Sequence, residues 1–240
     1  MKEEKLKNMF NNISDKYDFI NHILSFGIDF MWRKKIIYSL KQFTKDKKIK
    51  SILDLATGTG DLAILLANKF NKSHIIGLDP SDKMLEIARR KIKKKSLEKR
   101  IKIIQGSSQN IPFQNETFDL VTIAFGIRNF QYIHFSIKEI YRILKSTGIL
   151  GILEFSTPSY FLIKKIYHLY SYVYSKIGGF LSKNYFAYDY LRKSIESFSY
   201  SGEKMNNLLK YHKFNIFYSK KLTFEIVSIY LSNKNIFLNN

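Results

Sequence analysis

The stretch LDLATGTGDLA, residues 53–63, joins a short apolar run to a glycine-containing turn. The apolar run predicts a buried strand, and residues 62–70 after the turn predict a helix. Such a turn uses glycine because some positions need positive φ and because a side chain would keep a ligand off the backbone. Asp79 ends the next apolar run, where a carboxylate can bind both ribose hydroxyls of an adenosine-containing ligand. The stretch therefore predicts a nucleotide-binding unit, with a tight turn that binds nothing as the structural alternative.

Apolar runs and helical patterns alternate on both sides of this unit. Such alternation predicts a parallel, doubly wound α/β sheet. Residues 214–232 predict two more strands joined by a short turn, which makes the sheet mostly parallel and seven-stranded. The other expected strands are 51–55, 74–79, 101–106, 118–125 and 148–155, and the expected helices between them are 62–70, 82–95 and 136–144.

One domain is expected over residues 1–240. The first helical segment breaks at Ser25–Gly27, and a second helix is expected from about Phe30. After residue 157 the pattern changes to aromatic residues punctuated by lysines, at helical spacing. The expected segments are a helical N-terminal lid (1–45), a cofactor-binding core (46–157), an aromatic helical insertion (158–200), and a final helix with a strand pair (201–240).

The chain has 240 residues, no cysteine and five histidines. The lack of cysteine excludes disulfides, thiolate zinc sites and cysteine nucleophiles, and the histidines show no paired spacing, so no metal site is expected. The N-terminus MKEEKLKNMF lacks the apolar segment of a secretory signal. No stretch approaches the roughly 18 uncharged apolar residues of a membrane span. We expect a cytoplasmic protein, with peripheral attachment at the inner face of the membrane left open.

The formal net charge is +20, from 40 basic and 20 acidic residues. One interpretation is attraction to an anionic surface, either nucleic acid or the cytoplasmic face of a membrane. The other is compositional drift, because the abundance of Lys, Ile, Asn, Phe and Tyr is typical of an AT-rich genome. The basic residues are spread along the chain, and the one tight run, 91–95, is typical of a solvated helix face.

The glycine turn by itself does not identify its ligand. Residues 58–63 satisfy the G-x-G-x-x-G/A pattern of dinucleotide-binding proteins. Asp54 favours S-adenosylmethionine instead, because a strand carboxylate four residues before Gly58 can meet the ammonium group of that ligand, directly or through water. Helices also precede the first strand, whereas dinucleotide-binding domains often begin with it.

The later strands carry more specific motifs, and with them the chain resembles the quinone-biosynthesis C-methyltransferases that act on demethylmenaquinol and on the ubiquinone precursor. The resemblance runs nearly end to end. It implies a Rossmann-like fold of the class I methyltransferases that use S-adenosylmethionine. The motifs that carry it are Tyr17-Asp18, DLATGTGD (54–61), FGIRN (125–129), LEFS (153–156) with Pro158, and Tyr188 with Tyr190-Leu191 and Ser194-Ile195.

The resemblance also assigns residues to the cofactor site. Ser107 and Ser108 stand where the family usually has Asp or Asn followed by Ala, so hydroxyl or backbone groups are expected to bind the adenine amine. Ala124 stands where many members carry a cofactor-contacting serine. The expected cofactor-binding residues are Asp54, Gly58, Thr59, Gly60, Asp79, Ser107, Ser108 and Ala124.

The segment FGIRNF (125–130) raises the question of why a guanidinium follows an apolar strand. Burying it without partners is costly, but ligands of open α/β sheets bind outside the carboxyl ends of the strands. The resemblance implies C-methylation of a hydroquinone, in which a phenolate makes the ring carbon nucleophilic. Arg128 is then expected to stabilise the phenolate, and Asn129 to fix the loop or to hydrogen-bond a ring oxygen. The structural alternative for Arg128 is an ion pair with Glu154 or Asp119.

A guanidinium is a poor proton acceptor. A bound water, His22 or Tyr188 is therefore a candidate to take the hydroxyl proton, and the sequence does not choose among them. His22, a lone histidine in a helical segment, is as well explained by simple packing.

The aromatic insertion repeats apolar residues at helical spacing, at Leu162, Ile166, Leu169, Val173 and Ile177. One interpretation is a helix that packs this stripe against the core. The other is a lid over the polyprenyl tail of the quinol that dips toward an anionic membrane surface, where Tyr and Lys are common.

The expected partner is thus a prenylated quinol. A homodimer is left open, and no nucleic acid is expected, because the Asn/Asp-Pro-Pro-aromatic block of enzymes that methylate exocyclic amines is replaced by Gly-Ile-Arg-Asn. The rival functions are a nucleic-acid methyltransferase, suggested by the charge, and an inactive scaffold that binds the cofactor.

Overall fold

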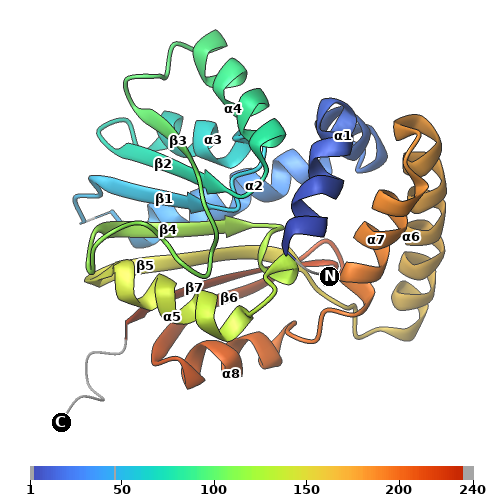
Figure 1. Cartoon of the computed structure of the whole chain (residues 1–240). Helices are drawn as coiled ribbons and strands as arrows, with labels where there is room; N and C mark the ends of the chain where they lie inside the picture. The colour runs from blue at the N-terminus through green and yellow to red at the C-terminus, as the bar shows by residue number, and fades with distance from the viewer. Residues whose placement is uncertain (1–2, 46, 235–240) are drawn as a thin grey trace.

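The computed structural model describes residues 3–45 and 47–234. Its centre is a sheet with the strand order β3-β2-β1-β4-β5-β7-β6, in which only β7 runs antiparallel to its neighbours (Figure 1). The predicted seven-stranded, mostly parallel sheet is confirmed. The strands are β1 (Ser51–Leu55), β2 (His74–Asp79), β3 (Ile101–Gln105), β4 (Phe118–Ala124), β5 (Leu144–Phe155), β6 (Phe214–Leu222) and β7 (Val227–Lys234).

Successive strand residues point to opposite faces of this sheet. Ile52 and Leu120 pack in one hydrophobic core, while their neighbours Leu53 and Val121 pack in the other. Helices α2 and α3 cover the first face, and α5 and α8 cover the second (Figure 1). Both faces are buried, which explains why the strands read as continuous apolar runs. The helices are α1 (Glu3–Leu24), α2 (Ile28–Phe43), α3 (Asp61–Lys69), α4 (Asp82–Lys94), α5 (Ile133–Ile143), α6 (Phe161–Ser182), α7 (Tyr185–Glu196) and α8 (Glu203–Tyr211).

Local signals set several helix ends. The Ser81 hydroxyl accepts a hydrogen bond from the Met84 backbone N–H at 3.3 Å, so Ser81 is the N-cap of α4. Gly60 precedes α3 with φ of 82°, and a Cβ there would lie 3.1 Å from the Cβ of Ala88 on α4. Gly60 therefore serves the turn and the close approach of two helices.

Other ends differ from the prediction. Helix α2 begins at Ile28 rather than near Phe30, and α5 begins at Ile133 rather than at 136. Strand β5 already begins at Leu144, because it follows α5 without a connecting loop. The insertion is two helices, α6 and α7, separated at Lys183, which adopts a left-handed conformation.

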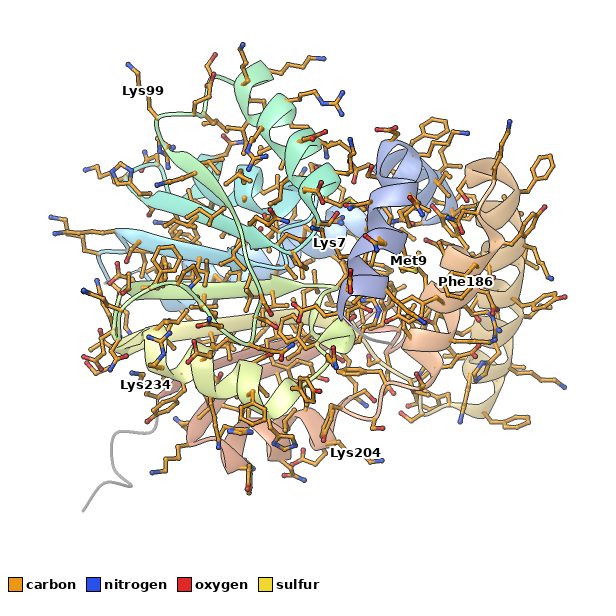
Figure 2. The ribbon with its side chains drawn as sticks, in the orientation of Figure 1. Lys7, Met9, Lys99, Phe186, Lys204 and Lys234 are labelled. Atoms are coloured by element: carbon orange, nitrogen blue, oxygen red, sulfur yellow. The ribbon has the colours of Figure 1, made fainter. Side chains whose placement is uncertain are left out.

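Helix α1 lies outside the two cores, between the sheet domain and the α6–α7 pair (Figure 1). It packs against α4 and α6 and shares a third apolar cluster with α4 and α7. This cluster includes Met84 and Met9, and Figure 2 labels Met9. Among the described helices, none is long and apolar enough to cross a membrane.

Candidate active site

A cavity of about 420 Å³ lies at the carboxyl ends of β1, β2 and β4. The order of the strands reverses between β1 and β4, which is where open α/β sheets bind their ligands. Helices α1, α6 and α7 line the cavity from the side opposite the sheet. The site is therefore built from the glycine turn, the ends of three strands, and three helices that lie outside the two cores.

The glycine turn presents its backbone to this cavity. Gly58 has φ of 54°, and a Cβ there would meet no atom within 4 Å. Its N–H donates to Asp79 Oδ2 at 2.9 Å, and Asp79 Oδ1 accepts from the Ser81 N–H at 2.9 Å. Asp79 thus ties the turn to the end of β2, and glycine at position 58 leaves the space beside the turn open for a ligand.

Asp54 and Asp79 are the two buried carboxyl groups of the cavity wall. Burial raises the pKa of Asp54 to about 6, against the opposing hydrogen bonds from the Thr57 and Thr122 hydroxyls at 2.6 and 2.9 Å. Burial likewise raises the pKa of Asp79 to about 6, against hydrogen bonds from Ser81 and Gly58. A cationic ligand in the cavity would favour the ionised form of both.

The structure brings six of the eight predicted cofactor residues to this cavity. Ser107 and Gly60 do not line it, and the Ser107 hydroxyl instead accepts from the Gln109 N–H at 3.3 Å. Gln109 lines the cavity in its place, a residue that sequence reasoning did not single out. The six that line it are Asp54, Gly58, Thr59, Asp79, Ser108 and Ala124.

These residues fit S-adenosylmethionine, which carries an ammonium group, a sulfonium, a ribose and an adenine. Asp54 and Asp79 supply negative charge for the ammonium group and hydrogen-bond acceptors for the ribose. The open backbone at Gly58 allows close approach, and Leu78 and Met84 add an apolar wall for a flat ring. Among the described residues, no cluster of three His, Asp or Glu side chains is arranged to hold a metal ion.

Arg128 lies in a short 3₁₀ helix directly after β4 and lines the cavity. Its side chain is 3% exposed, and its Nη1 lies 2.7 Å from Glu154 Oε1 and 2.6 Å from the Phe125 carbonyl oxygen. Burial alone would lower the pKa of Arg128, but the Glu154 carboxylate opposes this and the pKa lies above its ordinary value. The ion-pair alternative is therefore realised with Glu154, and Asp119 pairs with Lys145 instead.

The ion pair does not use the whole guanidinium. Nε of Arg128 donates to the Ser194 hydroxyl at 3.4 Å, and no described residue accepts a hydrogen bond from Nη2. Arg128 thus combines a fixed position with a donor that a ligand oxygen in the cavity can use. Asn129 also lines the cavity, and its Oδ1 accepts from the Tyr190 hydroxyl at 3.2 Å, so its amide nitrogen stays available.

His22 and Tyr188, two of the predicted proton acceptors, do not line the cavity. The His22 ring is 60% exposed and lies 3.1 Å from Asp29 Oδ1 at the outer end of α1. Tyr188 is fully buried against Gly178, and its hydroxyl has no hydrogen-bond partner among the described residues. The motif that contains Tyr188 did not show that this side chain packs against α6 rather than lining the cavity.

Tyr17 is the tyrosine that α1 brings to the cavity. Burial raises its pKa, while the positive charges of Arg128 and Arg33 act in the opposite direction. Its place in the Tyr17-Asp18 motif was the available signal, but the sequence analysis gave that segment only the role of a lid and did not assign Tyr17 to the site.

Asp18, the other half of that motif, connects α1 to the glycine turn. Asp18 Oδ1 accepts from the Thr59 hydroxyl at 2.7 Å, and Asp18 Oδ2 lies 2.6 Å from Lys91 Nζ on α4. Lys91 also lies 2.5 Å from Asp61 Oδ1. The Thr59 hydroxyl is therefore held by protein groups, and Lys91, expected on a solvated face, pairs with two carboxylates.

The fold matches that of a known class of enzyme. The structure is similar to a methyltransferase dependent on S-adenosylmethionine from Aquifex aeolicus, with a TM-score of 0.60 and 15% identity over 81% of this chain and 87% of that one. A putative enzyme of the same class from Methanococcus maripaludis matches with a TM-score of 0.58 and 24% identity, over 90% of this chain and 91% of that one. The chain thus has the fold of the S-adenosylmethionine-dependent methyltransferases.

Sequence comparison narrows the class to a family. The model of the ubiE/COQ5 methyltransferase family matches residues 1–234, and the chain belongs to that family. A demethylmenaquinone methyltransferase from Bacteroides fragilis is 40% identical over 97% of this chain and 94% of its own length. A ubiquinone/menaquinone biosynthesis C-methyltransferase from Wigglesworthia glossinidia brevipalpis is 40% identical over 89% of this chain and 84% of its own length. The predicted resemblance is confirmed, and family and fold together imply S-adenosylmethionine as cofactor.

Proposed function

We propose that this enzyme methylates a ring carbon of a prenylated hydroquinone, with demethylmenaquinol as the first candidate and the ubiquinone-precursor benzoquinol as the second. The observation that carries the proposal is the guanidinium of Arg128, held by Glu154 at the cavity beside the glycine turn. The names of the Bacteroides and Wigglesworthia relatives support both acceptors.

Different residues of the cavity bind the cofactor and the acceptor. When bound, S-adenosylmethionine supplies an electrophilic methyl group. Asp54 and Asp79 line the cavity and would hold the ammonium and ribose ends of that cofactor. The reacting carbon must then lie in line at about 3–3.5 Å.

Arg128 acts on the acceptor ring. A donor held beside a hydroxyl oxygen favours the phenolate, and phenolate charge spreads to the neighbouring ring carbon, which makes that carbon nucleophilic. Asn129 adds a second donor beside it. His22 and Tyr188 both lie outside the cavity lining, which leaves a water molecule as the remaining one of the three candidates to take the hydroxyl proton.

The chemistry of the acceptor also predicts where in the cell the enzyme acts. A prenylated quinol resides in a membrane, so we expect the protein in the cytoplasm with peripheral contact to an anionic membrane surface. A homodimer stays an open alternative, which sedimentation of the purified protein decides.

Transfer of labelled methyl from S-adenosylmethionine tests the proposal, with reduced demethylmenaquinol, the benzoquinol and bulk tRNA offered in parallel. We expect label in a quinol, and a loss of about 100-fold in kcat for Arg128→Ala, the size found on removing a donor that stabilises developing negative charge. Arg128→Lys should also be impaired because it lacks the planar fork. Label in tRNA alone would refute the proposal, and full activity of Arg128→Lys would refute the role of the guanidinium.

A further inference from the structure

A surface helix usually packs its large apolar residues against the protein, but helix α6 has the opposite orientation. The face that packs on the protein carries mostly small residues, such as Ser171, Ser175, Gly178 and Gly179. Gly178 is required there, because a Cβ would lie 2.2 Å from a ring atom of Tyr188. The core-facing side of α6 therefore offers contact area but few large apolar groups.

The large apolar residues of α6 point outward instead. Leu162 and Leu169 are each 67% exposed, and the interpretation in which this stripe packs against the core is wrong. Figure 2 shows side chains along α6 extending away from the body of the molecule, with the labelled Phe186 of α7 beside them. The exposed large apolar residues of α6 are Phe161, Leu162, Ile166, Leu169, Tyr170, Tyr172, Val173, Ile177, Phe180 and Leu181.

This exposed face continues to the mouth of the cavity. Tyr170 belongs both to the face and to the cavity wall, and its hydroxyl donates to the Leu24 carbonyl at the end of α1. Phe26, in the turn after α1, also lines the cavity although it is 84% exposed. Phe224, 72% exposed at the β6–β7 turn, follows the cavity residue Thr223. Exposed apolar side chains thus lie at or next to the cavity lining on three elements.

Positive charge accompanies this face. Helix α6 contains Lys164, Lys165 and Lys176 and no acidic residue, and the ammonium of Lys176 lies 5.4 Å from the centre of the Tyr172 ring. On the neighbouring α7, Asp189 and Glu196 are already paired with Arg192. The face is therefore apolar and basic, with no free carboxylate among its described residues.

We infer that the outward face of α6, with Phe26 and Phe224, docks on an anionic lipid bilayer so that the cavity opens toward the lipid. An apolar stripe with lysines beside it is the pattern of a helix that lies in the plane of a membrane interface. A second copy of this chain fits less well, because two such faces would bring lysines together without carboxylates to pair them. The inference rests on the proposed function, since a prenylated acceptor would then enter from the membrane without crossing water.

Vesicle binding with a matched pair of variants tests this inference. Leu162→Gln/Leu169→Gln alters the docking face, and Tyr38→Gln/Phe135→Gln removes two apolar residues of similar exposure, 64% and 62%, on α2 and α5. Partitioning is measured by co-sedimentation with vesicles of phosphatidylcholine containing phosphatidylglycerol. Methyl transfer is measured with a long-tailed quinol in those vesicles and with a short-tailed quinol in solution.

We expect the α6 variant to partition about tenfold less and to lose turnover in vesicles by a similar factor, because two exposed leucines no longer enter the lipid. The α6 variant should turn over the short-tailed quinol as fast as the wild type does. The control variant should match the wild type in every assay. Equal partitioning of both variants, or a wild-type dimer that the α6 variant dissociates, would overturn the inference. If no quinol is methylated while partitioning behaves as expected, the proposed function fails and the docking face stands.

Discussion

At the scale of single residues, the central feature is the buried pair of Arg128 and Glu154. Glu154 is 1% exposed and accepts from Arg128 Nη1, from the Arg128 N–H and from the Phe155 N–H. A buried charge is tolerated only when it is paired and hydrogen-bonded. The pair therefore answers why a guanidinium can follow a buried strand, and it holds Arg128 at the cavity wall.

Glu154→Gln should destabilise the protein by about 3 kcal/mol, because Arg128 would stay buried without its counter-charge. Denaturant unfolding measures this loss, and methyl transfer should fall with it. Arg128→Met/Glu154→Met is the control, because removing both charges should restore most of the stability but none of the activity. A Glu154→Gln enzyme with unchanged stability and turnover would mean that the pair is unimportant.

The raised pKa of Asp54, about 6, makes cofactor binding depend on pH. Below pH 6 the carboxyl is neutral and attracts no ammonium group, so the affinity for S-adenosylmethionine should fall as the pH drops from 7 to 5. Binding at pH 6 should release protons, since the cation favours the ionised form. The stability of the cofactor-free protein depends on pH in the opposite direction. Because the pKa of Asp54 is raised in the folded state, this group stabilises the fold at low pH, and that stabilisation is lost as the pH rises through about 6.

Calorimetry in buffers of different ionisation enthalpy measures the protons released. Asp54→Asn should reduce the release and flatten the pH dependence, while Asp79, with a similar pKa, should supply what remains. Affinity that does not change between pH 5 and 7 would contradict a direct role for these carboxylates.

At the scale of elements, α1 is joined to the cofactor turn by the cluster of Asp18, Thr59 and Lys91. These groups come from α1, the glycine turn and α4, and the two charged side chains are about 30% exposed. Partly buried, hydrogen-bonded charges contribute more than an exposed ion pair does. The cluster shows how α1, part of the predicted lid of residues 1–45, is attached to the glycine turn. The movement of this lid stays a prediction.

Asp18→Asn should weaken cofactor binding by roughly tenfold, about 1.4 kcal/mol, because α1 and the Thr59 hydroxyl lose a charged partner. Hydrogen exchange should show faster exchange along α1 in the variant. Lys83→Met is the matched control, since Lys83 pairs with Glu86 at 3.7 Å on the exposed side of α4. If both variants bind the cofactor like the wild type, the cluster does not couple α1 to the site.

At the scale of the whole molecule, the charge of +20 and the apolar face of α6 both bear on whether the protein binds a nucleic acid or a lipid bilayer. Distributed lysines attract any anionic surface, but a nucleic acid has no apolar layer to receive exposed leucines and phenylalanines. A bilayer offers both an anionic surface and an apolar interior. The vesicle experiment tests the apolar part of this contact, because both pairs of variants change apolar residues and leave the charge unchanged.

The sequence by itself determined the sheet, the glycine turn and the family. Apolar runs and glycine turns are set by residues close together in the sequence, and contiguous motifs such as FGIRN carry the resemblance. Only the tertiary structure decided that Arg128 pairs with Glu154 rather than Asp119, that Tyr17 rather than Tyr188 reaches the cavity, and that the stripe of α6 faces outward. The physical reason is that helical spacing defines which residues share a face, whereas packing between distant segments defines what that face meets.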